Sequence, residues 1–421
     1  MVVEFVRCVD HGTTTRASRP GPPIETMTGS QHTRRRLLAT LGCAATAGLA
    51  GCGGAGGGPT AGSDTSTAGT AGTATDPGAV TETATQTAAP AYEACMEPVG
   101  CLSFEEPPET WVANAGIYCD IGVALGLTDR LAAIGSPRRY YTGYYEELPG
   151  VSLDKRQYPV LSRGTRMPKE SFYAADADLH VIDPVWMVNT FGWTEADVEE
   201  IATNVGPFFG NYIREQQDAW HTYGYPTLSE AFGNVAALFG RRDRYERIEQ
   251  VRTELAETIR SRLPEERTEV LLLRPQGIPP TSFFPQYMDD SVSDLQWQVV
   301  AVEDALAGSD IPEWGVRIDY ETVARLDPEV IVMETQFADD FVLDGESFRE
   351  FTLNAMRDHP VARDVTAVEN GRVHAGGINY QGPLISLFQT EHAAQVAYPD
   401  EFGDEALFDR ERVAGIVTGD G

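Results

Sequence analysis

One short pattern occurs twice in this chain, with starting points 151 residues apart. Segments 170–182 and 321–333 each open with Glu, continue with Ser or Thr, carry Asp six places on, and run into an apolar stretch. Each segment predicts a short helix followed by a buried strand. The repetition predicts two similar α/β lobes with one acidic residue, Glu170 or Glu321, at the equivalent place. Two such lobes form a cleft that can hold a ligand, and the paired carboxylates indicate a symmetric docking partner.

Residues 1–52 have the features of an export and lipidation signal. Residues 33–38 read Thr-Arg-Arg-Arg-Leu-Leu, a twin-arginine pattern, and a stretch of Ala, Gly and Leu follows. That stretch is too short and too rich in glycine for a permanent transmembrane helix. The small residues before Cys52 predict that this cysteine carries a lipid. Met27 is an alternative start of translation.

Residues 53–90 consist mostly of Gly, Thr, Ala and Ser, and Val80 is their only large apolar residue. Such a segment cannot bury a core, so we expect a flexible tether. A lipid on Cys52 would then hold the folded part at the outer face of the cell membrane without spanning it.

The charge of the chain limits its partners. It has 63 acidic and 32 basic residues, a formal net charge of −31, and only two lysines, Lys155 and Lys169. So acidic a surface argues against nucleic acid as a partner. Scarce lysine in an acidic chain is typical of proteins from high-salt cells, such as those of halophilic archaea, where molar salt shortens the screening length to about 3 Å. An ordinary acidic protein is the alternative.

Three cysteines remain beyond the signal. A turn centred on Pro98 would place Cys95 opposite Cys101, so we expect a disulfide between them. Cys119 falls on an apolar helix face and is expected as a buried thiol. Cysteines scattered in this way do not predict a zinc site.

Strands and helices alternate along the rest of the chain, which predicts parallel sheets with crossover helices. We expect an α/β fold of two Rossmann-like lobes joined by a single long backbone helix. Residues 242–262 predict that helix, about 30 Å long, with a buried stripe of Ile248, Val251, Leu255 and Ile259. The predicted ranges are 91–226 for the first lobe, 227–263 for the helical connection, 264–402 for the second lobe, and 403–421 for an acidic tail.

Candidate ligand contacts follow from the rule that ligands bind at the carboxyl ends of parallel strands. The Arg138-Arg139 doublet suits carboxylate, phosphate or catecholate oxygens, and tyrosine faces can stack on flat ligands. Alternatively, these arginines pair with Glu146 and Glu147 while the tyrosines pack a loop. Trp186 and Phe283 could each be cleft wall or core. The full set of candidates is Tyr118, Arg138, Arg139, Tyr140, Tyr141, Trp186, Arg274, Phe283 and Tyr380.

The order of several segments resembles class III substrate-binding proteins of ABC importers, over about residues 92–402. The resemblance rests on Ala-Leu-Gly-Leu-Thr-Asp-Arg-Leu-Ala-Ala-Ile-Gly at 124–135, on the two repeats, on Asn-Gly-Arg-Val-His at 370–374, and on Tyr-Pro-Asp-Glu-Phe at 398–402. It implies a ligand in the cleft, of the ferric siderophore, haem or cobalamin kind, and little lobe closure. It also implies that Glu170 and Glu321 meet arginines of the two permease subunits. Alternatively, each Glu only favours its helix N-terminus.

The leading hypothesis is therefore a lipid-anchored monomeric binding protein, not an enzyme, that delivers a metal chelate or corrinoid to an ABC permease dimer. We expect no resident metal or cofactor, because His180 falls inside a strand and the other histidines show no ligand spacing. No nucleophile motif or phosphate loop is present. A secreted metal-dependent reductase or chelatase is the alternative, and it would need a carboxylate–histidine cluster in the cleft. A receptor for a peptide would need an open groove.

Overall fold

The computed structural model describes residues 92–216, 220–313, 315–337 and 345–419. The chain divides into two units, Met1–Glu82 and Thr83–Gly421, and all described residues belong to the second. The predicted signal, the lipidated Cys52 and the tether lie outside the described residues.

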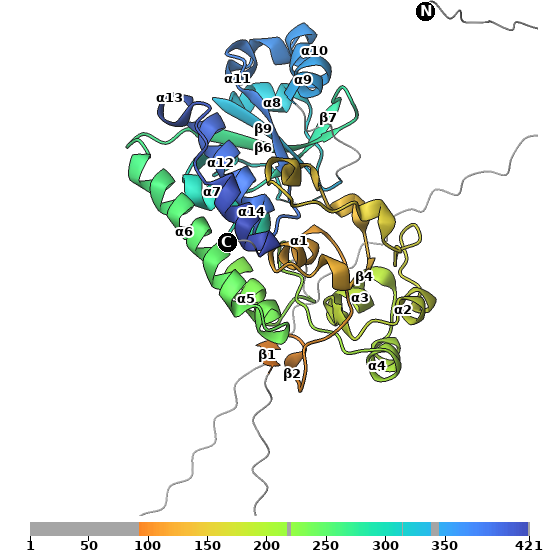
Figure 1. Ribbon diagram of the computed structural model, residues 1–421. Helices are drawn as coiled ribbons and strands as arrows, with labels where there is room; N and C mark the ends of the chain where they lie inside the picture. Colours follow the sequence, from red (N-terminus) through yellow and green to blue (C-terminus); the bar gives the residue numbers. More distant parts are fainter. Residues whose placement is uncertain (1–91, 217–219, 314, 338–344, 420–421) are drawn as a thin grey trace, which may run out of the picture. The chain divides into compact units, whose positions relative to one another are not determined.

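The first lobe contains a parallel sheet in the order β4-β3-β5. Its strands are short and apolar on both faces, as expected for a sheet covered by helices on both sides. Isolated bridges at Val160 and Phe208 extend the two edges of this sheet. The elements of this lobe are β3 (Trp111–Ala113), α1 (Gly116–Ala124), β4 (Leu131–Ile134), α2 (Lys169–Ala175), β5 (Leu179–Val181), α3 (Pro184–Phe191) and α4 (Glu195–Asn204) (Figure 1).

The second lobe contains a five-stranded sheet in the order β10-β9-β6-β7, with β8 also paired to β6. All pairs are parallel except β6 with β7. Its elements are β6 (Glu269–Gln276), β7 (Ser282–Gln286), α7 (Leu295–Val300), β8 (Glu303–Asp304), α8 (Tyr320–Leu326), β9 (Val330–Thr335), α9 (Gly345–Phe348), α10 (Asn354–Asp358), α11 (Thr366–Glu369), β10 (Val373–Ile378) and α12 (Ile385–Ala397).

The two sheets share a core topology. In each lobe the strand that follows the repeated helix, β5 or β9, pairs with the first strand of the lobe, β3 or β6. The opposite side of that first strand pairs with β4 or β8. The predicted pair of similar α/β lobes is therefore confirmed.

The repeated sequence pattern corresponds to the same local structure in both lobes. Helices α2 and α8 are each seven residues long, and each ends at an aspartate in the left-handed region, Asp176 with φ 46° and Asp327 with φ 47°. Aspartate tolerates this conformation better than most residues because its short side chain bonds locally. Glu170 and Glu321 each occupy the second position of their helix and are exposed.

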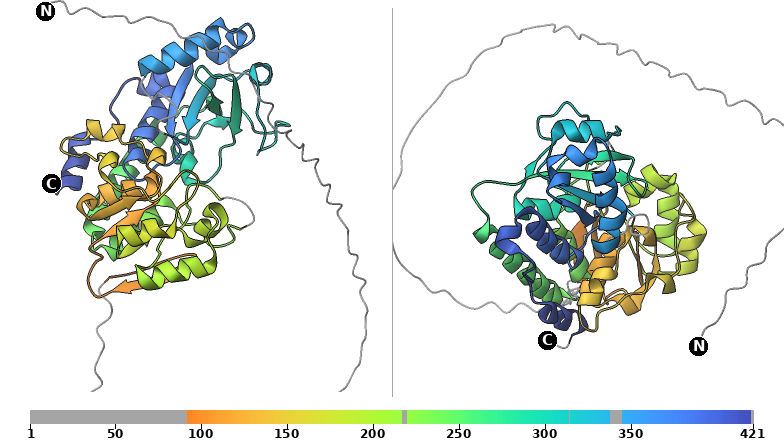
Figure 2. Two further views of the ribbon diagram at one scale, coloured as in Figure 1. Left: turned by 90° about the vertical axis from the view of Figure 1, so that its right-hand side faces the viewer. Right: turned by 90° about the horizontal axis from the view of Figure 1, so that it is seen from above.

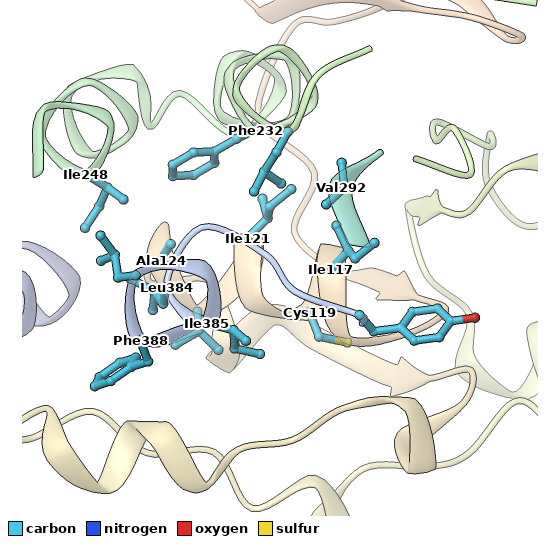
Figure 3. Packing of buried hydrophobic residues seen from close by; sticks show 14 of the residues in the cluster. Ile117, Cys119, Ile121, Ala124, Phe232, Ile248, Val292, Leu384, Ile385 and Phe388 are labelled. Atoms are coloured by element: carbon cyan, nitrogen blue, oxygen red, sulfur yellow. The ribbon is translucent and has the colours of Figure 1, made fainter. Parts of the chain in front are cut away.

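The long helix predicted to join the lobes is confirmed. Helix α6 (Arg242–Arg262) follows α5 (Leu228–Leu238) and has 21 residues. It packs against α1 of the first lobe and against α7 and α12 of the second, and Figure 2 shows it running beside both. Its predicted stripe is buried. Figure 3 shows Ile248 of this helix and Phe232 of α5 facing Ile121, Ala124 and Leu384 across the shared core.

The prediction of an acidic tail at 403–421 is wrong. After α13 (Pro399–Phe402), residues Arg410–Thr418 form helix α14, which packs against α1 and α6. Val413, Ile416 and Val417 are buried there. Their spacing of three and four residues is a helical apolar stripe, which the acidic residues around it obscured in the sequence.

An antiparallel hairpin of β1 (Tyr92–Met96) and β2 (Gly100–Phe104) precedes the first lobe. Cys95 and Cys101 are directly opposite each other in the register and form a disulfide. Cys119 is a free, buried thiol.

His180 provides a test of the first-lobe core. It lies in β5, fully buried between Phe172 and Phe208, and neither ring nitrogen has a hydrogen-bond partner among the described residues. Burial lowers its pKa from 6.5 to about 4, because the charged imidazolium would lose its hydration. The unfolded chain therefore binds this proton at a higher pH than the folded chain, so acidification destabilises the fold.

We expect the wild type to lose about 3 kcal/mol more unfolding free energy than His180→Phe as the pH falls from 6.5 to 4. Urea unfolding of both proteins across this range measures the difference, and all other titrating groups cancel in the comparison. Parallel pH profiles for the two proteins would contradict the assignment of His180 as a buried neutral residue.

Candidate functional site

The carboxyl ends of the two sheets meet at one cleft. Tyr380 follows β10 of the second lobe and its hydroxyl accepts a hydrogen bond from Arg139 of the first lobe at 2.6 Å. The same hydroxyl lies 3.1 Å from the hydroxyl of Tyr212, which also belongs to the first lobe. These bonds place the predicted contacts Arg139 and Tyr380 on facing walls of the cleft.

Four arginines gather on two phenylalanine rings at this cleft, and we call this set the arginine–aromatic cluster. The guanidinium carbons of Arg138 and Arg139 lie 4.8 and 5.4 Å from the ring centre of Phe337. Those of Arg274 and Arg317 lie 4.7 and 5.1 Å from the ring centre of Phe284. Each separation is within the range of a cation–π contact. The cluster therefore concentrates positive charge at the cleft of a chain whose net charge is −31.

Three of the four guanidinium groups of the cluster have no carboxylate partner in the described part of the chain. Among the described residues, Arg139, Arg274 and Arg317 form no ion pair. Burial lowers the pKa of Arg274, and the nearby charge of Arg214 lowers it further. An anion in this position would relieve both effects, because it supplies hydrogen bonds and opposite charge.

A cavity of about 500 Å³ adjoins the cluster and is lined by Arg274, Gln276, Phe284, Thr335 and Phe337. Arg274, Gln276 and Thr335 lie at the carboxyl ends of β6 and β9, Phe337 lies just after β9, and Phe284 lies on β7, the antiparallel neighbour of β6. The cavity has the size of a small-molecule site.

A second, much narrower cavity of about 30 Å³ lies between Trp186, Tyr212 and Tyr380. Trp186 is stacked on Tyr212, with ring centres 4.8 Å apart. Tyr118 also lines this cavity, and burial raises the pKa of its hydroxyl. The predicted contacts Tyr118, Trp186 and Tyr380 therefore come together, in a space that holds little more than a water molecule.

A buried arginine forms part of this narrower cavity. Arg214 is 2% exposed, donates from Nε to the Tyr212 hydroxyl at 2.9 Å, and forms an ion pair with Glu215. Its guanidinium also lies 5.2 Å from the ring centre of Tyr380 in the other lobe. Arg214 is therefore a buried guanidinium, paired with a carboxylate, that lies behind the cleft surface.

Two of the predicted contacts are wrong. Tyr140 is fully buried, and its hydroxyl lies 2.6 Å from that of Tyr145, which in turn donates to Asp120 at 2.5 Å. The ring thus completes an internal hydrogen-bond network. Phe283 is also fully buried, in contact with Tyr320. Side chains alternate along β7, so its neighbour Phe284 faces the cleft instead.

The predicted contact Tyr141 lies neither in the core nor in a cleft cavity. It is half-buried and packs edge-to-face on Tyr144, whose own ring stacks on Phe388 of α12. It lines neither of the two cleft cavities in the described part of the chain.

Sequence reasoning missed five residues of the cleft: Tyr212, Arg214, Phe284, Arg317 and Phe337. Phe337 could have been found, because it comes two residues after the end of β9. Tyr212 and Arg214 follow the isolated bridge at Phe208, which is too short to leave a strand pattern in the sequence. Nothing in the sequence around Arg317 predicts that this residue lies at the cleft.

The two repeated glutamates lie away from these cavities, at the starts of α2 and α8. Beside Glu170, the preceding Lys169 donates to Glu200 at 2.7 Å and also pairs with Asp197. Within the described ranges, neither Glu170 nor Glu321 forms an ion pair. Both carboxylates are thus accessible to a partner.

No group of three or more His, Cys, Asp or Glu side chains among the described residues is arranged to hold a metal ion. None of the helices in this part of the chain combines the length and the apolar character needed to cross a membrane.

Comparison with known proteins places this fold in one structural class. No family model and no curated protein sequence matches the chain. Among solved structures, the TroA-like periplasmic binding protein FepB from Veillonella parvula matches with a TM-score of 0.54 and 14% identity, over 78% of this chain and 95% of its own. CeuE from Helicobacter pylori, with Ni(II) bound, matches with a TM-score of 0.51 and 14% identity, over 76% of this chain and 94% of its own.

The heme binding protein HmuT matches with a TM-score of 0.50 and 16% identity, over 75% of this chain and 93% of its own. The protein described here therefore has the two-lobed α/β fold of periplasmic binding proteins. Within that class its architecture is similar to that of the TroA-like members.

Proposed function

We propose that this chain is an extracytoplasmic solute-binding lipoprotein of an ABC importer. It captures an anionic metal chelate of the iron–siderophore type in the cleft between its lobes and passes the chelate to the permease. The protein binds and releases the chelate without converting it chemically. Haem and cobalamin are the other cargoes that the sequence resemblance implies.

The arginine–aromatic cluster is the observation that carries this proposal. Guanidinium groups form paired hydrogen bonds with catecholate and carboxylate oxygens, and aromatic rings pack on the flat faces of such ligands. Four of them around two rings suit a ligand with several negative charges spread over its surface. The adjoining cavity of about 500 Å³ offers room for part of such a chelate.

The fold supports the same function. Structures with this fold include a protein solved with Ni(II) and a heme binding protein. A long helix packed against both lobes favours a cleft that opens and closes only slightly, because bending it would break several backbone hydrogen bonds. The cavity of about 500 Å³ lies in the second lobe, at the arginine–aromatic cluster to which the first lobe contributes Arg138 and Arg139. Two lobes held by one helix, with such a cavity at their cleft, suit the capture of a bulky solute.

The cellular setting proposed here follows from the sequence. Export by the twin-arginine route and a lipid on Cys52 would hold a monomer at the outer face of the membrane. The acidic, lysine-poor composition suggests a high-salt cell, so binding should be measured in molar salt.

Titration of the purified protein distinguishes the cargoes. We expect a trianionic ferric tris-catecholate to quench tryptophan fluorescence with a dissociation constant of about 1 μM or lower. A neutral ferric tris-hydroxamate of similar size should bind at least about tenfold more weakly, because it gains no charge-assisted bonds. Haem, cobalamin and free Fe³⁺ are titrated alongside.

Native mass spectrometry of the same samples shows whether the ligand stays intact. An unconverted chelate bound to one copy of the chain is the expected result. Turnover of any substrate would favour the metal-dependent enzyme, and tighter binding of the neutral chelate would contradict the anionic cargo.

A further inference from the structure

The hairpin of β1 and β2 has two different faces. Ala94 and Met96 are buried, and β1 packs against α5. Cys95 and Cys101 lie on the opposite face and are exposed. Their disulfide is therefore open to solvent, although the hairpin itself is anchored to the first lobe.

The disulfide also borders a groove. A cavity of about 570 Å³ is lined by Cys95 and Glu97 of the hairpin, by Tyr225 of the loop before α5, and by Arg242 and Tyr245 of α6. Its polar and aromatic lining gives a reactant room to approach Cys95 along a defined surface. Disulfides buried in a core lack such access.

We propose that the Cys95–Cys101 disulfide is a reduction site for a dithiol reductant in the folded protein. A thiolate of the reductant attacks one cysteine sulfur, the Cys95–Cys101 bond breaks, and the other cysteine leaves as a thiolate. The second thiol of the reductant then displaces the first cysteine from the mixed disulfide. Two electrons and two protons pass to the cysteine pair, and the reductant leaves as its own disulfide.

The hairpin is connected to the cleft by hydrogen bonds. The backbone oxygen of Glu97 accepts from Nδ2 of Asn211 at 2.8 Å. The Tyr118 hydroxyl donates to the backbone oxygen of Asn211 at 2.9 Å, accepts from its backbone N–H at 3.0 Å, and lies 3.5 Å from Met96 Sδ. Residues 96 and 97 thus help to position Asn211, which is buried.

Asn211 begins the segment that lines the narrower cleft cavity. Tyr212 follows it directly, and Arg214 comes two residues later. The disulfide cross-links the two strands of the hairpin, so its loss increases the fluctuations of these strands. Reduction should therefore loosen segment 211–214 through the bonds to Asn211. This inference goes beyond the proposed function and holds whatever the cargo is.

The first measurement is the rate of reduction. The mature chain is incubated with dithiothreitol, alkylated at intervals, and analysed by peptide mass spectrometry for the pair Cys95 and Cys101. We expect reduction at least about tenfold faster than global unfolding measured under the same conditions. Reduction only at the rate of global unfolding would overturn the proposal.

The second measurement is amide hydrogen exchange in the oxidised and reduced chains. Exchange should increase by about threefold or more in peptides covering 92–104 and 211–214, and stay unchanged in β9. The Cys95→Ser/Cys101→Ser variant should match the reduced chain. Faster exchange in the hairpin alone would refute the connection to the cleft.

Tyr118→Phe tests the route, because it removes the hydroxyl and keeps the ring. In this variant, exchange at 211–214 should already be fast in the oxidised chain, and reduction should add little. If reduction still produces the full increase, the Tyr118 hydroxyl does not transmit the effect.

Discussion

Replacing Glu170 and Glu321 together by alanine is expected to abolish uptake of the cargo while leaving its affinity for the protein unchanged. Both residues occupy the second position of equivalent helices, α2 and α8, and both are exposed. Neither lines a described cleft cavity. The two halves of this prediction therefore involve different surfaces.

The physical reason is the geometry of the duplicated lobes. Equivalent carboxylates on two similar lobes can meet two equivalent arginines on a permease dimer. Such charge-assisted pairs fix the orientation of a complex more than they increase its affinity. Loss of one pair still leaves the other, so we expect each single variant to retain part of the uptake and only the double variant to lose all of it.

A matched control is available on the same molecule. Glu199 of α4 and Glu257 of α6 are also exposed glutamates on helices, one in the first lobe and one in the connection. The Glu199→Ala/Glu257→Ala variant carries the same change in net charge and should transport normally. Normal uptake by the Glu170→Ala/Glu321→Ala variant would show that the repeated glutamates only favour their helix N-termini.

The Arg139→Ala/Arg274→Ala variant is expected to bind a trianionic ferric chelate at least about 100-fold more weakly than the wild type. Hydrogen bonds to charged groups contribute about 1.5–3 kcal/mol each, which corresponds to about 10-fold to 150-fold per arginine. The two arginines approach the cleft from different lobes, one against Phe337 and one against Phe284. Calorimetric titration in molar salt measures the loss.

Two controls separate charge, geometry and general damage. Arg363→Ala removes an exposed arginine of the second lobe whose ion pair with Asp364 lies on the surface, and affinity should not change. Arg139→Lys keeps the charge without the forked donors, so it should recover only part of the affinity. Equal losses for the trianionic and the neutral chelate would indicate that the substitutions disturb the cleft rather than remove anion contacts.

Much of the fold could be predicted because its signals are local. The stripe on α6 and the turn from α2 into β5 depend on residues within a few positions of each other, and the prediction of both is confirmed. The predictions failed where the same local pattern fits two different positions of a side chain. Phe283 and Phe284 are adjacent aromatics on one strand, and only the packing of the sheet decides which of them is core.

The cleft was less predictable. Tyr140 belongs to a run of tyrosines whose polar hydroxyls favour a surface position in the sequence. In the structure its hydroxyl is buried and bonds to that of Tyr145, which donates to Asp120. Nothing in the sequence around Arg317 indicates that it lies near Arg274, and the position of Phe337 after β9 does not indicate which arginines it contacts. Their contacts join segments far apart in the chain, and the spacing of apolar residues along the sequence predicts only local structure.

The sequence by itself determined the duplicated lobe, the helix that joins the lobes, and the two equivalent glutamates, because backbone preference and apolar spacing act over a few residues. Only the tertiary structure decided which side chains form the cleft, how the hairpin connects to it through Asn211, and that residues 410–418 return to the first lobe. Those features depend on which surfaces become buried against each other when distant segments meet, and that choice is made by the whole core at once.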